Sequence, residues 1–196
     1  MTIYAAMRLL HVSSAFGMFV FMGVELGAVW LLRRAATPAD VRRAFGVVQG
    51  NSRFGPLVLF GVLIPGLFLG YRWGFPWWTR IALLSFVAMG ALGGAVTGRR
   101  VRKLLGTIGD GAAPLTDAEA ALVRDPMLRW SLCLRVALVC GIALLMLIKP
   151  GAIGALSIVA GLLAIGALVA RRRPSAISPP LSTDRPSSAV SQARAR

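Results

Sequence analysis

The chain is poor in acidic residues, histidine and cysteine. Its 196 residues include seven Asp and Glu, one His and two Cys, against twenty-two Lys and Arg. The cysteines, Cys133 and Cys140, lie seven positions apart in one apolar stretch, so we interpret them as buried small hydrophobic side chains that do not pair. No GxxxxGK[ST], GxGxxG, HExxH or GxSxG motif occurs. Hydrolase and nucleotide-driven chemistry therefore lack support, and the sequence leans against an enzyme.

Charge is also missing from three long stretches, residues 54–71, 81–98 and 150–170. A helix of roughly 20 apolar residues crosses the hydrocarbon core of a bilayer. Two further stretches reach that length while carrying charge: residues 9–32 contain His11 and Glu25, and residues 127–148 contain Arg129 and Arg135. The sequence therefore predicts an all-α, polytopic transmembrane helix bundle over residues 1–170. Its five spans are expected at about 5–32, 54–71, 79–98, 127–148 and 150–170.

The abundant basic residues lie mainly between these stretches, on alternate sides. They gather between spans one and two, between spans three and four, and after span five, whereas the opposite side has only Arg8, Arg72, Arg80 and Lys149. The positive-inside rule then predicts an outer N-terminus and an inner C-terminus in a bacterial inner (cytoplasmic) membrane. Anionic lipid is an expected partner of the basic inner loops. Nucleic acid is not, because the cations are not interleaved with aromatics on a soluble surface.

The segments outside the spans carry local signals of their own. Residues 171–196 are rich in Pro, Ser and Arg, which predicts a disordered cytoplasmic tail. Thr37 with Asp40, and Thr116 with Glu119, have capping-box spacing, and each pair predicts the start of a short surface helix. Asp125 is expected to cap span four.

Glu25 is the only acidic residue within a predicted span. Arg135, in span four, lies at a matching depth, because both residues are about 12–15 Å from the inner boundary at 1.5 Å per residue. We therefore expect an intramembrane ion pair; alternatively, Glu25 is protonated and neutral. The pair either fixes how the helices pack or lines a path for a proton, ion or polar solute.

The single histidine, His11, belongs to a polar and sulfur-bearing stripe along span one. At helical spacing one face carries Met7, His11, Ser14, Met18, Met22 and Glu25. Thioethers suit Cu(I), and imidazole suits copper or haem iron, so His11 with Met7 or Met18 is a candidate copper or haem site. The alternative is a core face of flexible methionines with one satisfied histidine.

Glycines at a spacing of four mark small-residue faces on three spans. Gly23 and Gly27 lie opposite the stripe on span one, Gly66 and Gly70 lie on span two, and Gly90, Gly94 and Gly98 follow one another on span three. Such spacings let helices approach closely. We expect these residues at helix contacts, with a homodimer face as one form of that contact.

Three stretches carry a resemblance to a known family: LLHVSSAF (9–16), RDPMLRWSLCLRVAL (124–138) and LLMLIKPG (144–151). They resemble an uncharacterised bacterial family of integral membrane proteins, a domain of unknown function. That family is distantly similar to copper-resistance D-type proteins and to the haem-carrying membrane protoporphyrinogen oxidase. The resemblance implies an inner-membrane protein, and it places His11 where the oxidase has a haem ligand.

Two functions stay open at this point. In the first, the chain is a small transport or accessory protein whose interior Glu25 and Arg135 bind or gate a solute. In the second, it is a copper- or haem-binding redox protein that uses His11.

Overall fold

The computed structural model describes residues 2–52, 54–109 and 111–172, and these form helices and no strands. The elements are α1 (Ile3–Leu32), α2 (Pro38–Ser52), α3 (Gly55–Arg72), α4 (Trp77–Ala91), the π-helix η1 (Leu92–Gly98), α5 (Arg99–Thr107), α6 (Asp117–Val123), α7 (Pro126–Ile148) and α8 (Ala152–Arg171). The expected tail falls mostly on residues 173–196, which lie outside the described part.

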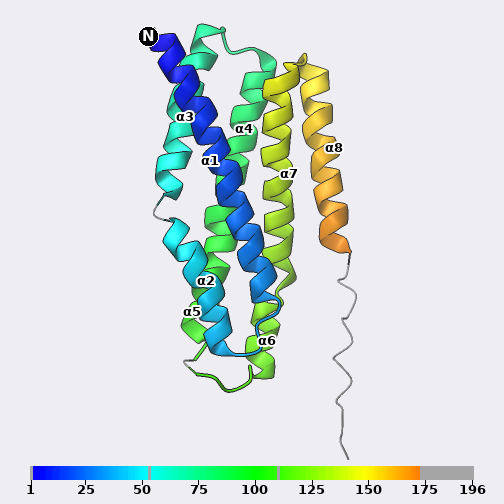
Figure 1. Cartoon of the computed structure of the whole chain (residues 1–196). Coiled ribbons are helices and arrows are strands. Elements are labelled where there is room, and N and C mark those ends of the chain that lie inside the picture. Colours follow the sequence, from blue (N-terminus) through cyan, green and yellow to red (C-terminus); the bar gives the residue numbers. More distant parts are fainter. Residues whose placement is uncertain (1, 53, 110, 173–196) are drawn as a thin grey trace, which may run out of the picture.

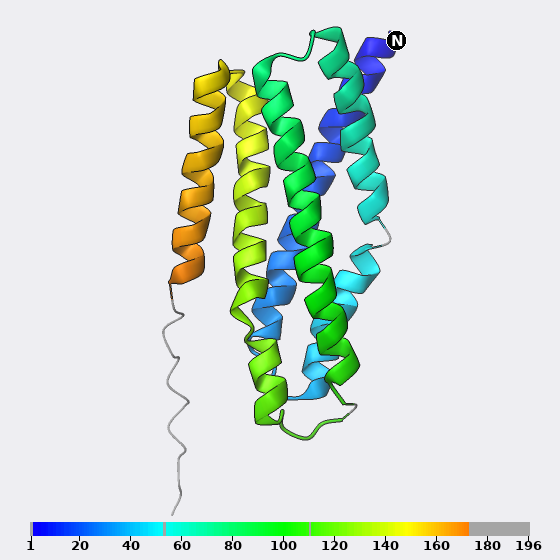
Figure 2. The same cartoon turned by 180° about the vertical axis from the view of Figure 1, so that it is seen from behind.

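The predicted all-helical class is confirmed for the described residues, and five helices are long and apolar enough to cross a membrane. Their apolar parts are α1, α3, α4 with η1, α7 and α8, and they indicate a multi-pass membrane protein. Figure 1 shows these helices as one elongated bundle, with α8 at its edge beside α7. The short turns that follow α3 and α7 lie at one end, and α2, α5 and α6 lie at the other (Figures 1 and 2).

The five long helices enclose an apolar core, built mainly from α1, α4 and α7. Leu145 and Ala155 are fully buried, and Met18, Met22 and Met89 lie beside them in the same cluster. Large apolar side chains on the outside of the bundle remain exposed, including Ile153 and Leu147. An apolar exterior around an apolar core is what a lipid environment permits and water does not.

The prediction that the capping boxes begin short surface helices is confirmed for α2 and α6. Both boxes are formed, and each helix keeps an exposed face while it buries its apolar side chains on the other face. With α5 they enclose a second apolar core at the basic end, in which Val41 and Leu104 are almost fully buried. The side chain of Arg42 also donates to the carbonyl of Ile108 at 2.9 Å and joins α2 to the end of α5. The bundle therefore continues beyond its spans as a compact cap.

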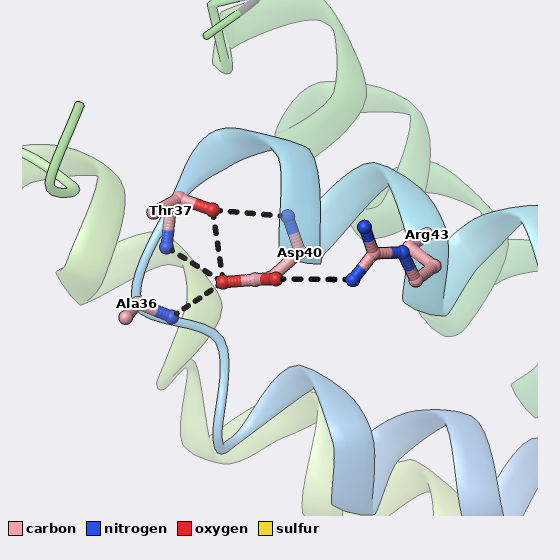
Figure 3. Close-up of polar contacts among 4 residues, drawn as sticks. All are labelled: Ala36, Thr37, Asp40 and Arg43. Carbon is pink, nitrogen blue, oxygen red and sulfur yellow. Dashed lines mark hydrogen bonds and ion pairs between the residues drawn. The ribbon is translucent and has the colours of Figure 1, made fainter. Parts of the chain in front are cut away.

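The cap depends on the box at the start of α2, which Figure 3 shows. One carboxylate oxygen of Asp40 accepts from the N–H groups of Ala36 and Thr37 and, at 2.8 Å, from the hydroxyl of Thr37. Arg43 lies 3.5 Å from the other oxygen. The Thr37 hydroxyl and the N–H of Ala36 lower the pKa of Asp40 below its usual value, with a smaller contribution from the charge of Arg43. The box thus stabilises α2 through an ionised carboxylate.

Candidate functional site

The structure brings Glu25 of α1 and Arg135 of α7 together inside the bundle. Nη1 of Arg135 lies 2.8 Å from Oε2 of Glu25, and their side chains are 8% and 15% exposed. That oxygen is not aligned for a hydrogen bond, so the contact is ionic. The two helices hold the residues at this depth because α7 places Arg135 ten residues, about 15 Å, after its cap at Asp125.

The guanidinium of Arg135 has more donors than partners. Its Nη2 contacts only the sulfur of Met22, at 3.7 Å, and its buried Nε has no hydrogen-bond partner within the described residues. A buried N–H without an acceptor costs about 1–3 kcal/mol. Arg135 is therefore a charged group with N–H donors that no protein acceptor uses. An ion pair with only a structural role would not need these spare donors.

The π-helix η1 makes room for this guanidinium. A Cβ at Gly93 would lie 3.3 Å from Cζ and Nε of Arg135, so a side chain there would press on the charged group. One turn before Arg135, the hydroxyl of Ser131 donates to the carbonyl of Leu92 at 3.2 Å and contacts the hydroxyl of Thr97 at 2.8 Å. These hydroxyls satisfy backbone and side-chain groups of the widened helix, and single π-turns of this kind occur often at functional sites.

Two cavities meet at the ion pair. The larger, about 240 Å³, is bounded by α1, α3 and α4, and both Glu25 and Arg135 form part of its wall. The smaller, about 40 Å³, lies on the side of the cap and reaches Thr97 and Phe45. A space of 240 Å³ beside a buried charge holds several waters or one small solute. The pair thus lies where a polar molecule within the bundle would meet it.

His11 lies apart from this pair, on the contact between α1 and α3. Its Nδ1 is 2.9 Å from the carbonyl oxygen of Val62, and a Cβ at Gly66 would lie 3.0 Å from its ring. Because a carbonyl only accepts, Nδ1 carries a proton, and in the neutral ring Nε2 keeps its lone pair. Two further residues of the expected stripe also face inward: Ser14 lies against Gly61, and the buried Met18 lies in the apolar core.

The candidate metal donors around His11 differ in one residue from those that the sequence suggested. A groove of about 600 Å³ at the end near the α3–α4 turn is lined by His11, Met18 and Met146, whereas Met7 does not line it. Met146 was missed because it belongs to α7, whose register against α1 no local pattern reveals. Within the described residues, no group of three His, Cys, Asp or Glu is placed to hold a metal ion. A metal or haem here would therefore depend on His11 and thioethers alone.

The glycine prediction needs correction within the described chain. No atom of a neighbouring helix lies within 4 Å of a Cβ built at Gly23, Gly27, Gly90 or Gly94, and Gly98 meets only a carbonyl of its own helix. The predicted close approach does occur on span two, where a Cβ at Gly66 would lie 3.0 Å from the ring of His11, and further close approaches occur at Gly61 and Gly93, which the spacing did not mark. The spacing marks a small-residue face but does not say which face a neighbour takes. Contact between two copies through the open glycines stays a prediction.

Comparisons of this chain with known proteins assign no role to the site, so its function is argued from its own residues. No protein-family model, no curated protein and no solved structure matches this chain.

Proposed function

We propose that this protein is a small transport or accessory protein of the bacterial inner membrane, with its N-terminus outside and its C-terminus inside. The proposal depends most on one observation: a buried ion pair, with a spare N–H on Arg135, forms the wall of a cavity large enough for a small solute. Ionisable groups within membranes are costly and usually mark the path of an ion or a polar substrate.

The orientation is supported by where the fold gathers its charge. The cap formed by α2, α5 and α6 carries the basic segments of both longer connections, and the opposite turns are short. Positive residues near span ends favour the cytoplasmic side. Trp73, in the α3–α4 turn, and Trp77, at the start of α4, are 40% and 59% exposed and fit the opposite interface.

In this mechanism a small solute with an acceptor oxygen, or an anion, enters the larger cavity and bonds the spare donors of Arg135. Glu25 holds the guanidinium in place until the solute arrives, and competes with it afterwards. Release toward the cap would pass the hydroxyl of Thr97, which lines the smaller cavity and contacts the hydroxyl of Ser131.

The test is flux into vesicles that contain the purified protein. Chloride and protons are suitable first probes, since they are the smallest partners of a guanidinium and a carboxylate. We expect flux of at least one probe above protein-free vesicles, and its loss in the doubly neutral variant Glu25→Gln/Arg135→Gln. Arg43→Gln, in the cap, is the matched control. Equal flux through the neutral variant would refute a role for the pair.

A second function, binding of copper or haem, is favoured by the hydrogen bond of His11. An Nδ1–H held by a backbone carbonyl is the arrangement that orients a metal-ligating imidazole. His11 would supply Nε2, with Met18 or Met146 as a thioether ligand from the same groove. Such a group would supply electron-transfer chemistry. An absorption spectrum and metal analysis of the purified protein test this: a Soret band or stoichiometric copper, lost in His11→Ala, supports it, and a colourless, metal-free, folded protein contradicts it.

A further inference from the structure

The basic end of the bundle contains a second site, separate from the buried pair. A pocket of about 410 Å³ lies between η1 with α5 and the junction of α6 with α7. Three cations line it, Arg99, Arg100 and Lys103, together with one carboxylate, Asp125. Three positive charges and one negative charge leave a formal charge of +2 in the pocket.

Only one of the three cations is neutralised by the protein. Arg100 forms an ion pair with Asp125, and the other oxygen of that carboxylate accepts from the N–H of Met127 at 2.9 Å. The side chains of Arg99 and Lys103 form no ion pair or hydrogen bond with any described residue. They are four positions apart on one helix face, where like charges repel each other. An anion between them would remove that repulsion.

The other wall of the pocket is apolar and begins where the third span ends. Ala95 and Val96 of η1 line it with Met127 of α7, and the side chain of Met127 is 45% exposed. Arg99 is the first charged residue after the apolar stretch that ends at Gly98. The pocket therefore spans the boundary between the hydrocarbon and the headgroups, with its cations on the headgroup side.

We propose that this pocket binds one anionic phospholipid, with the phosphate between Arg99 and Lys103 and the acyl chains along Ala95 and Met127. A soluble phosphate would use the cations but not the apolar wall, whereas a lipid uses both. Basic pockets between helices at the inner side of a membrane suit phosphate headgroups. The inference does not depend on the solute site, since Glu25 and Arg135 belong to neither wall.

Native mass spectrometry of the detergent-purified full chain tests this proposal. We expect one bound phosphatidylglycerol, retained in preference to phosphatidylethanolamine. The double variant Arg99→Gln/Lys103→Gln should bind it about 30-fold more weakly, from two charges near the surface. The control Arg33→Gln/Arg102→Gln removes two exposed cations of the same end that do not line the pocket, and should retain the lipid.

A third variant separates a lipid from a free anion. Ala95→Trp fills the apolar wall without changing any charge, so it should weaken phosphatidylglycerol and leave any binding of inorganic phosphate unaltered. Equal loss in the control pair would show general charge attraction and overturn the proposal. Displacement of the lipid by inorganic phosphate at matched concentration would also overturn the proposal. Unchanged lipid binding in both Arg99→Gln/Lys103→Gln and Ala95→Trp would overturn it as well.

Discussion

The ion pair between Glu25 and Arg135 predicts an unequal response to removal of its two partners. In Glu25→Gln the guanidinium stays charged and buried, because arginine is not deprotonated in proteins. Breaking a buried pair in this way costs about 3–5 kcal/mol of the free energy of unfolding. In Arg135→Gln the remaining carboxyl can take up a proton and become neutral, so we expect a cost of about 1–2 kcal/mol.

The doubly neutral variant completes the cycle. Glu25→Gln/Arg135→Gln leaves no charge and two amides that can bond each other, so it should cost no more than about 2 kcal/mol, less than the single change at Glu25. The coupling free energy, the sum of the two single costs minus the cost of the double change, is then at least about 2–5 kcal/mol. Unfolding in mixed detergent micelles, followed by tryptophan fluorescence, gives the four values. A coupling below about 0.5 kcal/mol would refute the reasoning, because two side chains in buried contact must couple more strongly.

Three further predictions follow from other parts of the fold. Gly61→Ala should destabilise the bundle by about 1–3 kcal/mol, because its Cβ would overlap the facing serine of α1, whereas Gly90→Ala, in open space, should be neutral or slightly stabilising in unfolding assays. Since the pKa of Asp40 is lowered below 3.8 on folding, its contribution is present above that pH and is lost as the pH falls through the lower folded value. Hydrogen-exchange protection factors at the start of α2, taken relative to the unfolded chain at the same pH, should therefore fall in that acidic range, and Asp40→Asn should show the lower protection already at neutral pH. For the orientation, a membrane-impermeant maleimide should label Tyr71→Cys in intact cells, and Arg102→Cys only after the membrane is opened; the reverse pattern would invert the topology.

Much of the membrane bundle follows from where charge is missing. In a bilayer, an apolar stretch of about 20 residues can satisfy its own backbone hydrogen bonds only as a helix. The five long helices were therefore predictable from the sequence. The contact between Glu25 and Arg135 was also within reach, because the rise of a helix converts distance along the chain into depth. Each charge is the only plausible partner of the other at that depth.

The remaining features depend on how helices face each other. No pattern in the sequence of η1 indicates a π-helix. Its widened turn forms where it contacts Ser131 and Arg135, which belong to another helix. Met146 enters the groove of His11 only through the register of α7 against α1. The cap is a similar case, since the apolar positions of α2, such as Val41, become a core only once α5 lies against them.

The central claim is that solute in water reaches the buried pair through the larger cavity, and cysteine labelling tests it most directly. In a background with Cys133 and Cys140 replaced by Ala, Val58→Cys puts a thiol on the cavity wall, and Leu57→Cys puts one at the same depth on the exterior, where Leu57 is 72% exposed. A charged methanethiosulfonate reacts only where water reaches the thiol. We predict modification of Val58→Cys and none of Leu57→Cys in lipid vesicles. A cavity thiol as unreactive as the lipid-facing one would show a dry space and contradict the account.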